Sequence, residues 1–221
     1  MYMLSQQLIE LKSDIEKSLP ENGSSYNVSI FPSSFVDAVI PFYSINAAEE
    51  EQPMLVDPWL AIGGTFQRYE KLNEVDAKEL IEKLNELTEL YFSDSSFVNG
   101  NVARYEHIKP FNVFIAGEGK NRVELFRQYN TAIKAAVRSY GYFSPSAIRI
   151  TYYPLNKTYQ FDTIYREKPY CTPILFPSIT VDLLKKYGAE IGSSYNLLDT
   201  LKNSRRLKLQ LNKLKMARMR G

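Results

Sequence analysis

Apolar residues recur every three or four positions in two stretches of the chain, and this spacing predicts two amphipathic helices. The first helix spans residues 3–19 and ends at Pro20, where a polar stretch begins. The second spans residues 76–92, and Asp76 followed by Glu79 resembles a capping box at its start. The apolar face of this second helix is formed by Leu80, Ile81, Leu84, Leu87 and Tyr91.

The second half of the chain predicts strands and a third long helix. Residues 111–116 predict a strand whose apolar part, Val113 to Ala116, is buried. A turn follows it, and we expect a long helix over residues 120–139 that ends at Gly141. Residues 147–153 and 157–165 alternate between apolar and polar positions, which predicts a β-hairpin.

The remaining segments give weaker signals. Residues 26–31 predict a short strand, and residues 170–176 form another apolar run. Ser178 is expected to cap a short helix that ends at Gly188. Residues 32–64 show no regular pattern. This order of helices and strands predicts an α+β fold, or mixed α/β.

Composition agrees with a soluble globular protein of 221 residues, since 44% of them are hydrophobic and 24% are charged. We expect three segments: residues 1–75 with the N-terminal helix, a core over 76–190, and a basic C-terminal segment over 191–221. The 16 Tyr and 12 Phe are typical of an aromatic sheet or of a surface on which bases stack.

Several kinds of chemistry are excluded by residue counts. One Cys (Cys171) cannot form a disulfide framework or a Cys-rich zinc site within one chain, and one His (His107) cannot form a paired-His metal motif. No stretch is apolar enough for a transmembrane helix, and the start of the chain does not resemble a signal peptide. We therefore expect a cytoplasmic protein without a membrane partner.

Positive charge gathers at the end of the chain. Residues 201–221 hold eight cations and no acid, so with a net charge of +2 the rest of the chain carries −6. Such a segment favours contact with DNA through Arg205, Arg206, Lys208, Lys213, Lys215 and Arg218. Leu207, Leu211 and Leu214 follow helical spacing, although the sequence around Leu209 also alternates like a strand. One alternative is a solvated helix that packs its leucines on the body. The other is a surface that binds a protein partner or a membrane.

The turn after the predicted strand at 111–116 is a candidate anion site. Gly117 and Gly119 permit unusual backbone angles and close approach of a phosphate, with Asn121 adding a further backbone contact. Lys120 and Arg122 oppose the dipole of a following helix, which is acceptable where they neutralise an external anion.

Glu118 lies in the middle of this turn and is the candidate metal ligand or general base. The alternative interpretation makes Glu118 a helix N-terminal carboxylate that the dipole favours, and makes the glycines an ordinary turn. The spacing does not match a Walker A loop.

Residues 115–122, Ile-Ala-Gly-Glu-Gly-Lys-Asn-Arg, resemble the core box of the ParB/sulfiredoxin-like superfamily. In ParB nuclease-like domains this box reads I-A-G-E-R-R-x-R-A, and Ala116, Gly117, Glu118 and Arg122 match it. The resemblance implies a compact α/β core that binds the phosphates of a nucleotide or nucleic acid at residues 117–122. It also implies a metal-dependent phosphohydrolase, either a nuclease or an NTPase, that uses a divalent metal such as Mg²⁺ and acts in DNA maintenance or plasmid transfer.

Departures from the family narrow this expectation. The chain has no E-N-x-x-R box and no clear helix-turn-helix, so a CTP-gated DNA clamp is not expected. A second segment, residues 62–69, resembles the sulfiredoxin box G-G-C-H-R-Y without its Cys and His, and Arg68 is a possible second anion contact. Residues 117–122 are preferred as the core box because their predicted flanking strand and helix are better formed. The rival hypothesis is a non-catalytic accessory protein that docks on a partner through its basic tail.

Overall fold

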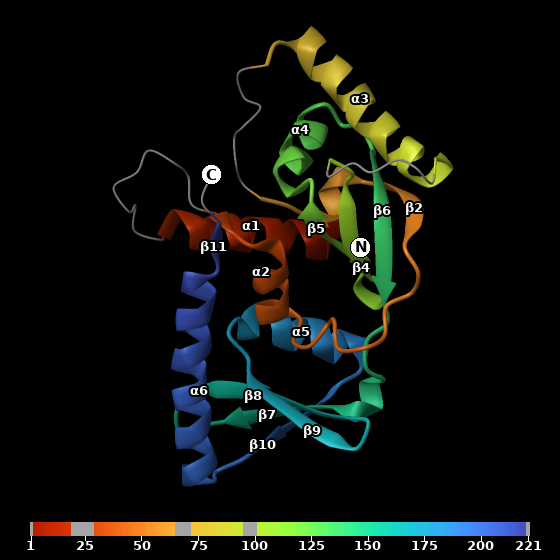
Figure 1. The fold of residues 1–221 in the computed structure, drawn as a ribbon. Helices are drawn as coiled ribbons and strands as arrows, with labels where there is room; N and C mark the ends of the chain where they lie inside the picture. The colour runs from red at the N-terminus through yellow and green to blue at the C-terminus, as the bar shows by residue number, and fades with distance from the viewer. Residues whose placement is uncertain (1, 19–28, 65–71, 95–100, 220–221) are drawn as a thin grey trace. The chain divides into compact units, whose positions relative to one another are not determined.

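The computed structural model describes residues 2–18, 29–64, 72–94 and 101–219 (Figure 1). This part of the chain forms six α-helices and two larger sheets, each of which contains parallel and antiparallel neighbours. The expected mixed α/β class is therefore confirmed. None of the described helices is both long and apolar enough to cross a membrane.

The chain divides into two compact units, and both are discontinuous in sequence. Unit 1 contains residues 1–33, 44–141 and 218–221, and unit 2 contains residues 34–43 and 142–217. Both units draw on all three of the segments that the sequence suggested.

A five-stranded mixed sheet forms the centre of unit 1, in the order β2-β6-β4-β5-β3. Its strands are β2 (Gln52–Val56), β3 (Ala61–Ile62), β4 (Arg104–Ile108), β5 (Val113–Glu118) and β6 (Ile133–Tyr140). Val113 to Ala116 are buried, as the apolar run predicted. β3 runs parallel to β5 at the sheet edge, so the segments that follow these two strands leave the sheet in the same direction.

The two amphipathic helices predicted for the first half are confirmed as α1 (Tyr2–Ser18) and α3 (Glu74–Ser93). The capping prediction was wrong, because Asn73 caps α3 and its Oδ1 accepts from the N–H of Asp76 at 2.9 Å. Ile81 and Leu84 of α3 are buried in the core of unit 1, together with Phe126 and Val137.

The helix predicted over residues 120–139 was wrong. The structure has a 3₁₀ turn (Lys120–Arg122), a short helix α4 (Val123–Gln128) and then strand β6. Ile133 and Val137 are four residues apart, which fits a helix, but Ile133, Ala135 and Val137 also alternate as a strand requires. The strand is more favourable than a helix because it places all three side chains in the core, where each is at most 1% exposed.

Residues 32–64 were predicted to be irregular, and this was also wrong. They contain α2 (Pro32–Val39), β2, a 3₁₀ turn (Pro58–Leu60) and β3. These elements are two to eight residues long, too short for periodicity to show clearly. Only Ser29–Ile30 of the strand predicted at 26–31 is described as a strand, β1, and it pairs with β11 (Arg218–Met219).

A buried ion pair within α1 also connects this helix to β1. Lys12 Nζ lies 2.5 Å from Glu16 Oε1, and the two side chains are 2% and 7% exposed. The same carboxylate oxygen accepts from Ser29 Oγ and from the N–H of Ile30. Burial lowers the pKa of Lys12, while the attraction of Glu16 opposes this shift.

Unit 2 is built on a four-stranded sheet in the order β10-β7-β8-β9. Its strands are β7 (Ile148–Tyr153), β8 (Thr158–Tyr165), β9 (Lys168–Pro173) and β10 (Glu190–Ser193). β7 and β8 form the predicted antiparallel hairpin. Phe161 and Ile150 are fully buried in this unit, and Phe143 packs against Phe161 with ring centroids 6.1 Å apart.

Helices α5 (Pro177–Tyr187) and α6 (Leu197–Met216) complete unit 2, with most of α2. Ser178 does not cap α5, because the helix starts with Pro177 after Phe176 and has no side-chain cap. Gly188 ends α5 as predicted, with φ of 106° in the left-handed region that favours glycine. The basic segment forms a 20-residue helix, which decides between the helical and strand-like patterns of its leucines.

Candidate anion-binding sites

The glycine turn at residues 117–122 lies at the end of β5 in unit 1. The strand continues through Gly117 and Glu118, which are exposed. Gly119 then adopts φ of 76°, so the expected need for a glycine at this turn is met. The following 3₁₀ turn leads into α4, which has only six residues. A helix this short provides a much weaker N-terminal dipole than the long helix that the sequence suggested.

Some backbone groups of the turn bond to the protein itself. The N–H of Arg122 donates to the carbonyl of Gly119 at 3.0 Å, and the N–H of Gly64 donates to the carbonyl of Lys120 at 2.9 Å. Arg122 is 7% exposed, and its Nη1 donates to the carbonyl of Asn101 at 3.0 Å. The Arg122 guanidinium therefore serves a carbonyl of its own unit.

The other candidate residues of the turn are less enclosed. Lys120 is half-buried, and its Nζ lies 5.9 Å from the centroid of the Phe31 ring. Asn121 has a buried Oδ1 without a hydrogen-bond partner among the described residues. Glu118 is exposed, and the described residues contain no group of three His, Cys, Asp or Glu side chains that could hold a metal ion.

The two segments that resemble family boxes meet in the structure. A Cβ added to Gly63 would lie 2.7 Å from Cβ of Val123 and 2.8 Å from the carbonyl oxygen of Lys120, so only glycine fits there. The reason for preferring residues 117–122 holds for the strand and fails for the helix. The six-residue β5 leads into this turn and only the two-residue β3 leads into the 62–69 segment, but the short α4 follows residues 117–122 and the 20-residue α3 begins at Glu74. Arg68, the possible second contact, lies outside the described residues.

Sequence reasoning missed Arg127, which holds three parts of unit 1 together. Its Nε donates to the carbonyl of Pro58 at 2.9 Å, its Nη2 donates to the carbonyl of Ala61, and its Nη1 pairs with Glu124 at 3.0 Å. The guanidinium also lies 5.8 Å from the ring of Trp59. Burial lowers the pKa of Arg127, and the attraction of Glu124 opposes this shift. The role of Arg127 is recognised from its burial in the structure, because no sequence motif distinguishes this arginine from an exposed one.

The single histidine is held in unit 1 by three side chains. Its ring stacks on Phe114 with centroids 4.1 Å apart, and Nε2 lies 3.1 Å from Asn112 Oδ1. Ser139 Oγ lies 3.4 Å from His107 Nδ1, which is longer than the contact of an activated nucleophile with its base. Burial lowers the pKa of His107, which favours the neutral ring. These contacts fix the position of the His107 ring in unit 1.

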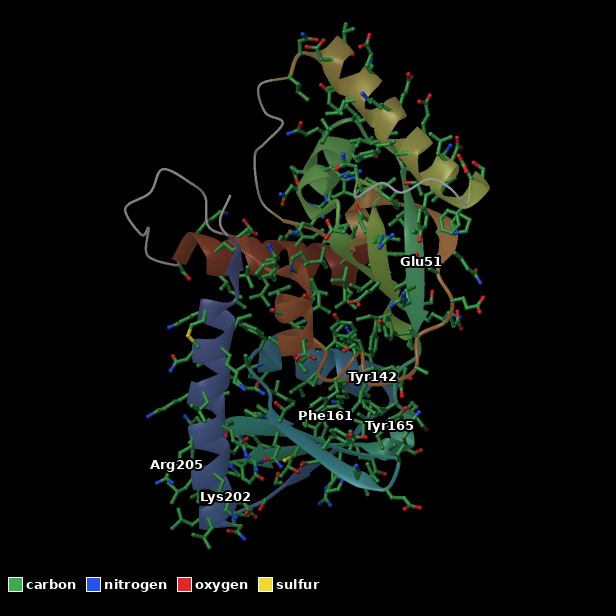
Figure 2. All side chains as sticks on the ribbon, in the orientation of Figure 1. Glu51, Tyr142, Phe161, Tyr165, Lys202 and Arg205 are labelled. Atoms are coloured by element: carbon green, nitrogen blue, oxygen red, sulfur yellow. The ribbon has the colours of Figure 1, made fainter. Side chains whose placement is uncertain are left out.

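The second candidate site is α6 in unit 2, which carries six cations and one acid. Arg205, Lys208, Lys213 and Lys215 are exposed and form no ion pair with another described residue. Figure 2 shows Arg205 extending from α6 away from the sheet residue Phe161. Lys213 also lines a cleft of about 340 Å³ with residues of α2 and β9. Arg218 belongs to β11 in unit 1, where only its backbone is described.

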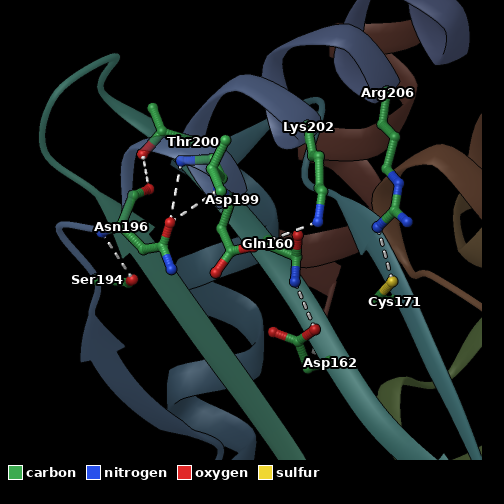
Figure 3. Close-up of polar contacts among 10 residues, drawn as sticks. Gln160, Asp162, Cys171, Ser194, Asn196, Asp199, Thr200, Lys202 and Arg206 are labelled. Atoms are coloured by element: carbon green, nitrogen blue, oxygen red, sulfur yellow. Dashed lines mark hydrogen bonds and ion pairs between the residues drawn. The ribbon is translucent and has the colours of Figure 1, made fainter.

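Two further cations of α6 have contacts within unit 2 (Figure 3). Arg206 Nη1 donates to Cys171 Sγ at 2.9 Å, and Lys202 Nζ lies 4.0 Å from Asp199 Oδ1. Asn196 caps the helix by accepting from the N–H groups of Leu198 and Asp199. The cap fixes where α6 begins, inside the C-terminal segment expected over residues 191–221 and four residues before the stretch 201–221 that holds the eight cations.

The face that α6 packs against unit 2 is more polar than expected. Thr200, Asn203 and Leu214 are buried, and Asn203 Nδ2 donates to Thr158 Oγ1 at 2.9 Å. Of the predicted leucine stripe, Leu214 is buried and Leu207 is half-buried, whereas Leu211 is 36% exposed. Other apolar side chains of α6 face solvent. Between 52% and 75% of the surface is exposed in Leu197, Leu198, Leu201, Leu209 and Met216. The sequence analysis took Leu207, Leu211 and Leu214 as the apolar face of the helix and therefore missed these exposed side chains.

Comparison of the chain with protein families, with curated proteins and with solved structures found no match.

Proposed function

We propose that this protein is a non-catalytic accessory protein of a DNA-handling assembly, and that α6 is the element by which it docks on an anionic macromolecule. One observation carries the proposal: a folded, 20-residue helix presents six cations against a single acid, and four of those cations have no described acidic partner. The ParB-like residues 115–122 suggest the DNA-handling context.

The cations of α6 should make the affinity for DNA depend on salt concentration. Each phosphate that a cation neutralises releases counterions, and the slope of log K against log salt concentration is about −0.9 per contact. If Arg205, Lys208, Lys213 and Lys215 all contact phosphates, we expect a slope of about −3.6. Binding of this kind is independent of sequence.

The test compares the full chain with a variant in which Arg205, Lys208, Lys213 and Lys215 are all replaced by Gln. A matched control carries the same loss of four charges on exposed lysines elsewhere: Lys83, Lys168, Lys185 and Lys186. We expect the α6 variant to lose at least tenfold in affinity for duplex DNA at low salt and the control to lose far less. Equal losses in the two variants would mean that net charge, and not α6, drives binding.

A second candidate function is phosphate binding at the glycine turn, with a nucleotide bound together with Mg²⁺ as the ligand. The observation that favours it is the meeting of Gly63 and Gly64 with Lys120 beyond the ends of the adjacent parallel strands β3 and β5. Ligands of open α/β sheets commonly bind beyond the carboxyl ends of strands. Magnesium is often held by one or two carboxylates together with phosphates, and Glu118 is the carboxylate this turn offers.

Thermal shifts with nucleoside triphosphates, with and without Mg²⁺, test this second candidate. A ligand present at 100 times its Kd stabilises the folded state by about 2.7 kcal/mol, which is several degrees in Tm. We expect Lys120→Gln to abolish the shift and Lys83→Gln to preserve it. Glu118→Ala should remove any dependence on Mg²⁺ and abolish metal-dependent turnover without unfolding the chain. The candidate is wrong if no triphosphate shifts the wild-type Tm.

A further inference from the structure

The outward face of α6 combines leucines with cations in a regular order. Leu198, Arg205, Leu209 and Met216 are separated by seven, four and seven residues, so they lie nearly in one row along the helix. Leu198 is 68% exposed, Leu209 is 62% exposed and Met216 is 75% exposed. Lys202 and Lys213 each follow a leucine of this row by four residues, which places a cation beside it.

We infer that this face of α6 binds an acidic amphipathic helix of a partner protein. The inference rests on the proposed role of α6 as the docking element and names the chemistry of its occupant. Apolar side chains of the partner would cover Leu198, Leu209 and Met216, and its acidic residues would pair with Arg205, Lys202 and Lys213. Leucine rows flanked by charges are the arrangement by which helices select partners of opposite charge.

The same observations disfavour the other occupants. A second copy of α6 would bring its own six cations against these six, and like charges across an interface are repulsive. A membrane surface requires a helix face that is continuously apolar, whereas Arg205 interrupts the row between Leu198 and Leu209. Phosphates of nucleic acid satisfy the cations but leave the three apolar side chains in water.

The experiment measures binding of the full chain to four probes. The first is a synthetic helical peptide with leucine and glutamate in heptads, and the second is a scrambled peptide of the same composition. Duplex DNA and phosphatidylserine-rich vesicles are the third and fourth. We expect the helical peptide to bind at least about tenfold more tightly than the scrambled one, because only the helix can align its leucines with the row on α6.

A charge-preserving variant separates the leucines from the cations. Replacing Leu198, Leu209 and Met216 by Gln is expected to weaken binding of the helical peptide about tenfold or more and to leave DNA binding unchanged. The matched control replaces three equally exposed apolar residues elsewhere, Leu55, Leu155 and Ile164, and is expected to change neither.

The possible outcomes have different meanings. Equal binding of the two peptides, or an unchanged affinity in the leucine variant, would overturn the acidic-helix inference while the docking role of α6 stands. Tighter binding to vesicles than to the helical peptide would mean that this face of α6 binds a membrane surface and not a partner helix. If the four-Gln variant of the cations binds every probe as the wild type does, the proposed function fails as well.

Discussion

The arginines of unit 1 and the cations of α6 have the same charge and opposite surroundings. Arg122 and Arg127 are 7% and 9% exposed, and their guanidinium groups donate to backbone carbonyls of their own unit. Arg205 and Lys208 are exposed on α6 without a described acidic partner. A buried cation needs internal acceptors because desolvation is costly, so it has little capacity left for a ligand. An exposed cation retains that capacity.

This difference changes how a basic motif should be interpreted. In the sequence, Lys120 and Arg122 beside two glycines indicated an anion site or an ordinary turn, and the C-terminal segment indicated a DNA contact or a solvated helix. In the structure Arg122 is committed to Asn101, and the cations of α6 are arranged on a capped helix. The functional proposal therefore rests on the exposed cations. Three predictions test the comparison.

Loss of Arg127 should have the largest effect on stability. Arg127→Met leaves the buried carbonyls of Pro58 and Ala61 without this donor, and each such loss costs about 1–3 kcal/mol. We expect unit 1 to lose about 3 kcal/mol of unfolding free energy. Trp59 is the only tryptophan and lies in unit 1, so its fluorescence during denaturant unfolding reports this unit. Lys83→Gln is the control, and an equal midpoint for the two variants would contradict a structural role for Arg127.

Substitution of Tyr105, in the same buried region, should have the opposite effect on the stability of unit 1. Its hydroxyl is fully buried and has no hydrogen-bond partner in the part of the chain that the structure describes. Burial raises the pKa of Tyr105, although Arg122 and Arg127 oppose the shift. We expect Tyr105→Phe to stabilise unit 1 by about 1 kcal/mol at neutral pH, because an unpartnered hydroxyl is costly to bury.

The pH dependence of this variant follows from linkage. Above about pH 10 the unfolded chain releases the phenol proton while the folded state retains it, so the wild type loses stability as pH rises. Tyr105→Phe should reduce this alkaline loss, which denaturant unfolding at pH 8 and pH 11 measures. Tyr129→Phe, at a half-buried tyrosine of the same unit, is the control. A steeper alkaline loss in Tyr105→Phe than in the wild type would refute the assignment.

The smallest effect is expected on α6. Replacing Arg205, Lys208, Lys213 and Lys215 by Gln should change the unfolding free energy of unit 2 by no more than about 0.5 kcal/mol, because exposed charges contribute little to stability. Thermal unfolding followed by circular dichroism measures this. A loss as large as that of Arg127→Met would show that these cations stabilise the fold, and the contrast between the two regions would disappear.

Long periodic elements were predictable from the sequence, and short or ambiguous ones were not. α1, α3 and the hairpin of β7 and β8 follow from spacing alone. β6 was mistaken for a helix because Ile133 and Val137 fit both periods, and only burial against the rest of unit 1 decides between them. α2 and β3 are shorter than the window in which a period can be recognised.

The candidate sites were predictable only in part. Charge counting identified the basic segment, and the glycines located a real turn with Gly119 at positive φ. The burial of Arg122 depends on Asn101, 21 residues earlier, and no local pattern records such a contact. The outward row of Leu198, Leu209 and Met216 could be recognised only when the start of α6 was known, because Leu198 lies in the first turn after the cap at Asn196.

The division of unit 2 in sequence has a consequence during synthesis of the chain. Phe35, Val36 and Ile40 are fully buried, yet they belong to residues 34–43, and the rest of their unit starts only at residue 142. At about 5–20 residues per second, the ribosome needs on the order of ten seconds to make the intervening stretch. For that time the nascent chain carries an apolar α2 sequence while the rest of its unit has not been made, so these side chains stay uncovered by unit 2 until synthesis passes residue 142.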